Sequence, residues 1–180
     1  MRAAVILLCG RSGAGKTTIA ERAKECFEVR GRRLLILDEN IIRQGLSSDL
    51  GFSTEDHVEQ QRRLGFVAEL FSTGGIAVIV ASIAPMAAAR KAFFAGCPTA
   101  RLAHVDAPLR VCKGRDAKGS LAKGLVRADI PFQEPSRSAV DVYLPTDVGL
   151  TVSELAMKVV RAMARSETPL LWLTEPGIYR

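Results

Sequence analysis

Apolar residues along this chain follow two alternating patterns. Short continuous apolar runs are typical of strands buried in a parallel sheet, whereas longer segments carry apolar residues at helical spacing. The runs that predict strands cover 4–9, 34–37, 76–81, 102–105 and, more weakly, 142–144. Helices are predicted over 16–30, from 53 to about 73, over 86–94, from 108 onward, and from 151 to about 163. Strand and helix alternating in this way predict a parallel sheet covered by helices on both faces.

Local signals mark where two of these helices begin. Ser53 precedes an acidic first turn that contains Asp56, and Thr151 is followed three residues later by Glu154. Short polar side chains before a helix accept hydrogen bonds from its first free N–H groups, and an acidic residue in the first turn suits the positive end of the helix. Both helices are therefore expected to begin at these residues.

The stretch between the first strand and the first helix carries the most specific chemical signal. Residues 10–17 read Gly-Arg-Ser-Gly-Ala-Gly-Lys-Thr and match the phosphate-binding pattern G-x-x-x-x-G-K-[ST] at every specified position. Glycines let backbone N–H groups point inward, and the following helix adds its positive N-terminal end. Lys16 is expected to reach the β and γ phosphates of a nucleotide, and the Thr17 hydroxyl to bind Mg²⁺.

The setting of this motif decides between two interpretations of it. A glycine-rich turn with an incidental lysine would not need a buried strand before it and a helix after it, and the chain has both. The fold class is therefore predicted to be a P-loop NTPase three-layer α/β/α sandwich with a mainly parallel sheet.

Length and composition fit one domain over residues 1–180. The chain is 48% hydrophobic and 24% charged, and it has no composition break or internal repeat. The segment from about 116 to 135 is rich in Lys, Gly and Pro and is expected to form a lid. The tail, 166–180, contains an apolar stretch that should pack on its own domain or on a second copy of the chain, so a homodimer is one expectation.

Charge and apolar runs limit the classes of partner. The net charge is +6, but only two Tyr and one Trp are present to stack on bases, so nucleic acid is not expected as a partner. The longest apolar runs are too short to cross a bilayer, and the first strand leaves no room for a signal peptide before it. The four cysteines lack metal-site spacing, so we expect a cytoplasmic protein with reduced thiols and no membrane partner.

Further motifs occur together with the phosphate loop. Asp38 ends the second strand, residues 43–53 read Arg-x-Gly-Leu-x-x-Asp-Leu-Gly-Phe-Ser, Arg62 and Arg63 follow, and residues 106–119 read Asp-Ala-Pro-Leu-x-Val-Cys-x-x-Arg-Asp-x-Lys-Gly. Together these segments closely resemble adenylylsulfate (APS) kinases over roughly residues 1–130, and the longer motifs are more specific than the loop alone.

The resemblance implies that ATP and Mg²⁺ donate the γ-phosphoryl group to the 3′-hydroxyl of APS, a small nucleotide. It assigns catalysis to the positions of Lys16, Asp38 and Asn40, and the metal to Thr17 and Asp38. The residues that it assigns to ATP are Gly10, Ser12, Gly13, Ala14, Gly15, Lys16, Thr17, Thr18, Arg115 and Lys118. The residues that it assigns to the acceptor are Arg43, Phe52, His57, Gln60, Ile83 and Phe132.

The sequence departs from the family pattern at the end of the second strand. The family normally has Asp-Gly-Asp-Asn, and the same four positions here are Asp38, Glu39, Asn40 and Ile41. Asn40 can form hydrogen bonds but cannot take a proton at neutral pH. Glu39 is adjacent, but its side chain would point away if strand alternation continued, so substitution by Glu39 is not favoured.

The acceptor side differs at other positions too. His57 and Gln60 replace a family Arg and Asn, residues 83–86 read Ile-Ala-Pro-Met in place of Ile-Ser-Pro-Tyr, and only Phe132 remains of a Phe-Thr-Gly-Ile segment. His57 lies in the first turn of a helix, where a histidine is ordinarily solvated. Two interpretations are equally supported: a role in acceptor binding, and an ordinary surface histidine.

Three functions therefore stay open. An APS kinase is the family default, and a kinase with another small, nucleotide-like acceptor is nearly as well supported. The third is a catalytically impaired regulatory subunit that binds ATP. A gluconate- or nucleoside-type kinase is disfavoured by the Asp-Leu-Gly-Phe-Ser segment.

Overall fold

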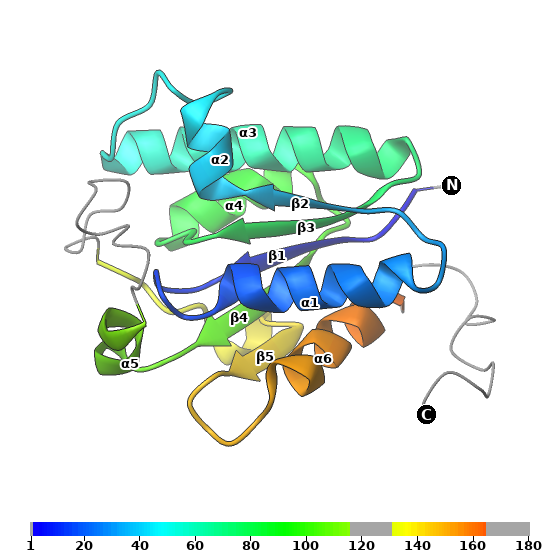
Figure 1. Ribbon diagram of the computed structural model, residues 1–180. Helices are drawn as coiled ribbons and strands as arrows, with labels where there is room; N and C mark the ends of the chain where they lie inside the picture. Colours follow the sequence, from blue (N-terminus) through cyan, green and yellow to red (C-terminus); the bar gives the residue numbers. More distant parts are fainter. Residues whose placement is uncertain (1, 116–130, 165–180) are drawn as a thin grey trace.

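The computed structural model describes residues 2–115 and 131–164, in which strands and helices alternate (Figure 1). The strands are β1 (Val5–Cys9), β2 (Leu34–Asp38), β3 (Ala77–Ser82), β4 (Arg101–Asp106) and β5 (Val142–Pro145). The helices are α1 (Lys16–Glu28), α2 (Glu39–Gln44), α3 (Thr54–Thr73), α4 (Ala87–Gly96), α5 (Leu109–Gly114) and α6 (Val152–Ala164), with a 3₁₀ turn at Arg137–Ala139. Most of the expected lid, including Lys118, and the apolar tail lie outside the described residues.

The five strands form one parallel sheet in the order β2-β3-β1-β4-β5. In the centre, Leu7 of β1 lies opposite Val80 of β3 on one side and Leu102 of β4 on the other. Because all pairs are parallel, every strand brings its carboxyl end to the same edge of the sheet, which is where open α/β sheets bind ligands. The predicted parallel sheet is thus confirmed, including its weak last strand.

Helices cover both faces of the sheet, α1 and α6 on one and α3 and α4 on the other (Figure 1). Alternation along β1 sends Ile6 and Leu8 into the core under α1 and α6, and Leu7 into the core under α3 and α4. Fully burying such a side chain stabilises the fold by about 1.5–3 kcal/mol. Within the described parts of the chain, no helix has the length and apolar character needed to span a membrane.

Both predicted helix starts carry reciprocal caps. Ser53 Oγ accepts a hydrogen bond from the Asp56 N–H at 3.1 Å, and the Asp56 carboxylate accepts one from the Ser53 N–H at 3.0 Å. Thr151 and Glu154 make the equivalent pair before α6, at 3.2 and 2.8 Å. The cap at Ser53 sets the entry of the chain into α3, the helix that carries the predicted acceptor residues His57 and Gln60.

Helices α3 and α4 approach each other closely through glycines. A Cβ placed on Gly65 would overlap with the carbonyl oxygen of Phe93, and one placed on Gly96 would lie 2.9 Å from the Phe66 nitrogen. The opposed atoms belong to the backbone and cannot move aside as a flexible side chain can. The spacing of the α3–α4 layer therefore depends on these two residues having no side chain.

We predict that Gly65→Ala lowers the free energy of unfolding by about 1–3 kcal/mol, because overpacking forces the two helices apart. Urea denaturation measures this change. Gly114→Ala is the matched control, because a Cβ at Gly114 would meet no atom of another described residue within 4 Å, its chain neighbours and own helix backbone aside. Equal stability of the two variants would contradict the close packing described here.

Candidate functional site

The phosphate loop lies between the end of β1 and the start of α1, and it contacts the backbone of the two strands that flank β1. The Gly10 N–H donates to the Ile83 carbonyl after β3 at 3.4 Å, and a Cβ on Gly10 would overlap with the Val105 carbonyl oxygen of β4. Gly13, with φ of 77°, packs equally closely on the Cys112 carbonyl. The loop therefore needs glycine both for its backbone angles and for its neighbours.

Lys16, the first residue of α1, holds its ammonium group at this loop. Its Nζ donates to the carbonyl oxygens of Gly10 and Arg11, both at 2.9 Å. Burial lowers the pKa of Lys16, and the negative charges of Glu39 and Asp38 oppose that shift. A phosphate oxygen is a stronger partner for an ammonium than a neutral carbonyl, so the lysine is placed to exchange these contacts for a bound nucleotide.

Thr17 and Asp38 bring two oxygen donors together beside Lys16. Thr17 Oγ1 donates to Asp38 Oδ2 at 2.9 Å, while Asp38 Oδ1 accepts the Asn40 N–H at 2.9 Å and so caps α2. No cluster of three or more His, Cys, Asp or Glu side chains suited to a metal occurs in residues 2–115 and 131–164. The donor set fits Mg²⁺, which takes one or two protein oxygens and completes its shell with phosphates and water.

Arg115 and Thr146 lie together beside the phosphate loop. The Arg115 guanidinium donates to Thr146 Oγ1 at 3.0 Å and to its carbonyl at 2.8 Å, and Thr146 Oγ1 donates to the Ala14 carbonyl at 3.0 Å. The family resemblance predicts Arg115 at ATP, but no sequence motif points to Thr146. Its position at the carboxyl end of the weak strand β5 was the signal that could have found it.

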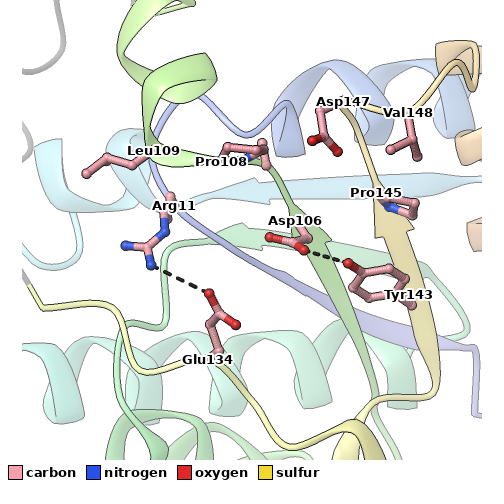
Figure 2. Close-up of a pocket in the computed structure, with 10 residues that line it drawn as sticks. Arg11, Asp106, Pro108, Leu109, Glu134, Tyr143, Pro145, Asp147 and Val148 are labelled. Atoms are coloured by element: carbon pink, nitrogen blue, oxygen red, sulfur yellow. Dashed lines mark hydrogen bonds and ion pairs between the residues drawn. The ribbon is translucent and has the colours of Figure 1, made fainter.

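A cavity of about 450 Å³ adjoins the loop on this side (Figure 2). Arg11 pairs with Glu134 at 3.6 Å, and the Tyr143 hydroxyl donates to Asp106 at 2.5 Å, an interaction that raises the pKa of Tyr143. Asp106 neither caps α5, whose cap position is Pro108, nor joins a metal cluster among the described residues. The remaining lining residues are Ala107, Pro108, Leu109, Pro145, Asp147 and Val148.

The predicted acceptor residues on α2 and α3 come together on the other side of the loop. The Arg43 guanidinium lies over the Phe52 ring at 4.9 Å and donates to the Gly51 carbonyl at 2.8 Å. The His57 ring lies 6.5 Å from that of Phe52, and Gln60 follows one turn later on α3. His57 is 2% exposed and Gln60 is fully buried, so neither is a solvated surface residue.

Many polar atoms in this region are buried without a partner. They find no hydrogen bond within the described residues, and they are Arg43 Nη2, Ser47 Oγ, His57 Nδ1 and Nε2, Gln60 Oε1 and Nε2, and Gln61 Oε1. An unpaired buried polar group costs about 1–3 kcal/mol, so a cluster of them is a place where water or a polar ligand can supply the hydrogen bonds. We call Arg43, Ser47, Phe52, His57 and Gln60 the acceptor cradle.

Glu39 corrects one expectation from the sequence. Strand β2 ends at Asp38 and α2 begins at Glu39, so strand alternation stops before Glu39. The Glu39 side chain therefore does not point away from the site. Glu39 is 4% exposed, and its Oε2 accepts hydrogen bonds from Ser82 Oγ and the Ile83 N–H, both at 2.7 Å. Gln61 supports this arrangement by donating to Ser82 Oγ at 2.6 Å. A buried carboxylate therefore lies between the loop and the cradle.

The other predicted residues occupy different positions. Ile83 is central, because its N–H donates to Glu39 and its carbonyl accepts from Gly10. Phe132 lies on the β4 side of the loop, stacked on His104 with ring centroids 5.9 Å apart and under Arg11 at 5.0 Å. Phe132 does not lie at the Phe52 ring, although the family resemblance assigns both residues to the acceptor.

The paired arginines of α3 are engaged with carboxylates. Arg63 forms a bidentate pair with Asp49 at 2.6 and 2.7 Å and donates to Glu59 at 2.9 Å, while Arg62 pairs with Glu59. Bidentate pairing fixes the loop that carries Asp49 against α3. Arg63 therefore supports the loop between Arg43 and Phe52 from outside, whereas Arg62 pairs within α3.

Comparison with known proteins identifies the family. The model of adenylylsulphate kinases matches residues 2–142. This chain belongs to the adenylylsulphate kinase family. A probable adenylyl-sulfate kinase of Synechocystis sp. is 38% identical over 154 residues, covering 82% of this chain and 86% of that protein. The adenylyl-sulfate kinase of Paraburkholderia xenovorans is 39% identical over 158 residues, covering 81% and 85%.

Solved structures agree with this assignment. The APS kinase of Mycobacterium tuberculosis, in a structure with AMPPNP and APS, matches with a TM-score of 0.81 and 31% identity over 90% of this chain and 98% of that chain. A gluconokinase from Sinorhizobium meliloti shares the fold alone, with a TM-score of 0.61 and 15% identity. The predicted fold class and the resemblance to APS kinases are both confirmed.

Because both histidines are buried, we predict that the free energy of unfolding decreases in mild acid. Burial lowers the pKa of both His57 and His104 below the ordinary value of 6.5. The unfolded chain therefore binds more protons than the folded chain below about pH 6.5, and the free energy of unfolding should decrease as the pH falls from 7.5 to 5. Urea denaturation across this range should show a shallower decrease for His57→Asn and for His104→Asn. Slopes identical to that of the unaltered protein would contradict the burial of neutral imidazoles.

Proposed function

We propose that this family member transfers the γ-phosphoryl group of ATP, with Mg²⁺, to the 3′-hydroxyl of APS. The observation that carries the proposal is that Lys16, Thr17 and Asp38 share one edge of the sheet with a cradle of buried polar atoms that lack partners. Phosphoryl transfer requires the attacking and leaving oxygens to be held in line and the charge on the phosphates to be neutralised, and it needs no covalent nucleophile. The names of the relatives support the choice of substrates.

On the donor side, each residue of the chain has a simple task. The N–H groups of the phosphate loop and the N-terminus of α1 would bind the β and γ phosphates, and Lys16 would leave the Gly10 and Arg11 carbonyls to contact them. Thr17 and Asp38 would hold Mg²⁺, which neutralises charge on the same phosphates. Arg115, fixed on Thr146, would pack against the nucleotide base.

On the acceptor side, Phe52 and Arg43 would grip the nucleotide of the acceptor. Arg43 now covers the Phe52 ring, so an acceptor base that stacks there must take its place. His57 and Gln60 together offer several donors and acceptors in a dry setting, where each satisfied hydrogen bond favours the ligand that supplies it. Ile83 would contribute through its backbone. Phe132 has no part in this proposal, because its ring packs on His104.

A second candidate keeps the kinase chemistry and changes the acceptor. It is favoured by the cradle itself, where His57 and Gln60 replace the Arg and Asn of the family pattern and Asn40 replaces an Asp. Amide and imidazole groups recognise hydroxyl and amide partners at least as well as sulfate. The acceptor would then be another small nucleotide-like metabolite with a free hydroxyl.

The deciding experiment measures ADP release with ATP, Mg²⁺ and APS. We expect turnover by the unaltered chain and a loss of about 10²-fold or more in kcat for Lys16→Ala, because the group that neutralises the transferred phosphate is gone. Lys24→Ala on the same helix is the control, since the Lys24 side chain is 39% exposed and pairs only loosely with Glu28 at 3.8 Å.

Other outcomes separate the alternatives. Turnover with a different member of a nucleotide panel, and none with APS, would support the second candidate. ATP binding without ADP release in the presence of any acceptor would contradict the kinase proposal and indicate a regulatory protein.

A further inference from the structure

Glu39 is a buried carboxylate that the mechanism above does not use. It is 4% exposed, it belongs to the first turn of α2, and it lies between the phosphate loop and the acceptor cradle. Removing a carboxylate from water is costly unless hydrogen bonds or opposite charges compensate. The position therefore requires an explanation in terms of what the negative charge does there.

The two oxygens of Glu39 have different surroundings. Oε2 accepts from both Ser82 Oγ and the Ile83 N–H at 2.7 Å, which fixes the orientation of the carboxylate. Oε1 faces the Arg43 Nε at 3.5 Å, an ion-pair contact that is longer than an ordinary hydrogen bond. One oxygen thus anchors the group, and the other is turned toward the cradle.

A short chain of contacts links this carboxylate to the donor side. Ile83 donates its N–H to Glu39 and accepts the Gly10 N–H through its carbonyl, and the Gly10 carbonyl in turn accepts from Lys16. The negative charge of Glu39 also opposes the lowering of the Lys16 pKa by burial. The Glu39 carboxylate is therefore close to both the ammonium that meets the γ phosphate and the cradle that would hold the acceptor.

The other candidates near the acceptor hydroxyl are unsuited to receive its proton. Asn40 carries an amide, and Asp38 already accepts from Thr17 and from the Asn40 N–H while facing the metal position. We propose that Glu39, through Oε1, is the catalytic carboxylate that accepts the hydrogen bond of the acceptor hydroxyl and then its proton. This inference rests on the kinase function proposed above.

The step balances as follows. The acceptor oxygen forms a bond to the γ phosphorus while the bond from that phosphorus to the bridging oxygen of ADP breaks, and its electron pair stays on ADP. The O–H bond of the acceptor breaks, and the proton passes to Glu39 Oε1 and from there to water. The carboxylate orients the hydroxyl before transfer, which matters because positioning supplies most of the rate in phosphoryl transfer.

The rival explanation is that Glu39 only ties α2 to the end of β3. Glu39→Gln separates the two roles, because the amide oxygen can take the place of Oε2 and keep both anchoring hydrogen bonds. The amide nitrogen then occupies the place of Oε1 and can accept neither a hydrogen bond nor a proton. A tie from α2 to β3 through Oε2 would survive this change, whereas a catalytic carboxylate would not. The change also removes the ion pair of Oε1 with Arg43, and the KM for APS reports that loss, because Arg43 is proposed to grip the acceptor.

We expect Glu39→Gln to lower kcat with APS by about 10²-fold, while the Kd for ATP and the KM for APS stay within about threefold. Adding Asn40→Asp to this variant should recover at least about tenfold in kcat, because a carboxylate returns one residue along the chain. Glu69→Gln is the control, a carboxylate that pairs with Arg2 at 2.7 Å far from the loop.

Stability is followed alongside activity. If Glu39→Gln lowers the Tm by more than about 5 °C, the comparison moves to Glu39→Gly and to Glu39→Gly combined with Asn40→Asp. Both members of that pair lack Glu39 and lose the same anchoring contacts, so the ratio of their kcat values reports the effect of a carboxylate at position 40. We expect the double variant to be at least about tenfold faster.

Two results would overturn the inference. An unaltered chain that turns APS over, with Glu39→Gln as active as Glu69→Gln, would show that Glu39 is a structural tie and would leave the kinase function standing. An unaltered chain that binds ATP but does not phosphorylate APS would contradict the proposed function, and the assigned role of Glu39 would fail with it.

Discussion

The site depends on the close approach of three strands around Gly10. Its N–H reaches the carbonyl that follows β3, its Cα rests on the Val105 carbonyl of β4, and its own carbonyl holds Lys16. A side chain at this point would overlap with the backbone of β4, so the loop could not close as it does. The apolar core fixes the strands, and the strands leave room for glycine alone.

The end of β3 joins the two halves of the site. The Ile83 carbonyl accepts the Gly10 N–H of the phosphate loop, while Ser82 Oγ and the Ile83 N–H donate to the Glu39 carboxylate. Because the sheet is parallel, donor and acceptor segments that are distant in sequence meet at this edge. The unpartnered atoms of the cradle lie just beyond Glu39, so the polar groups that need a ligand lie beside the loop that would supply the phosphate.

Sequence patterns predicted the features that are local. The strands, the phosphate loop and the caps at Ser53 and Thr151 follow from neighbouring residues, and the structure confirms them. The orientation predicted for the Glu39 side chain was wrong. It depends on the residue at which β2 ends, and the alternation pattern does not specify that residue. Contacts between segments distant in sequence could not be predicted from local patterns either. Thr146 donates to the Ala14 carbonyl, and Phe132 packs on His104 rather than near Phe52.

The central claim is that the phosphate loop and the acceptor cradle are two halves of one kinase site. A crystal structure with a non-hydrolysable ATP analogue, Mg²⁺ and APS tests it most directly. The account predicts the γ phosphate on Lys16, the metal on Thr17 and Asp38, the APS base on Phe52 with Arg43 moved aside, and the APS 3′-hydroxyl within hydrogen-bond distance of Glu39 Oε1. APS bound away from the cradle would contradict this claim. So would a cradle in which Arg43 still covers the Phe52 ring while the ATP analogue occupies the loop.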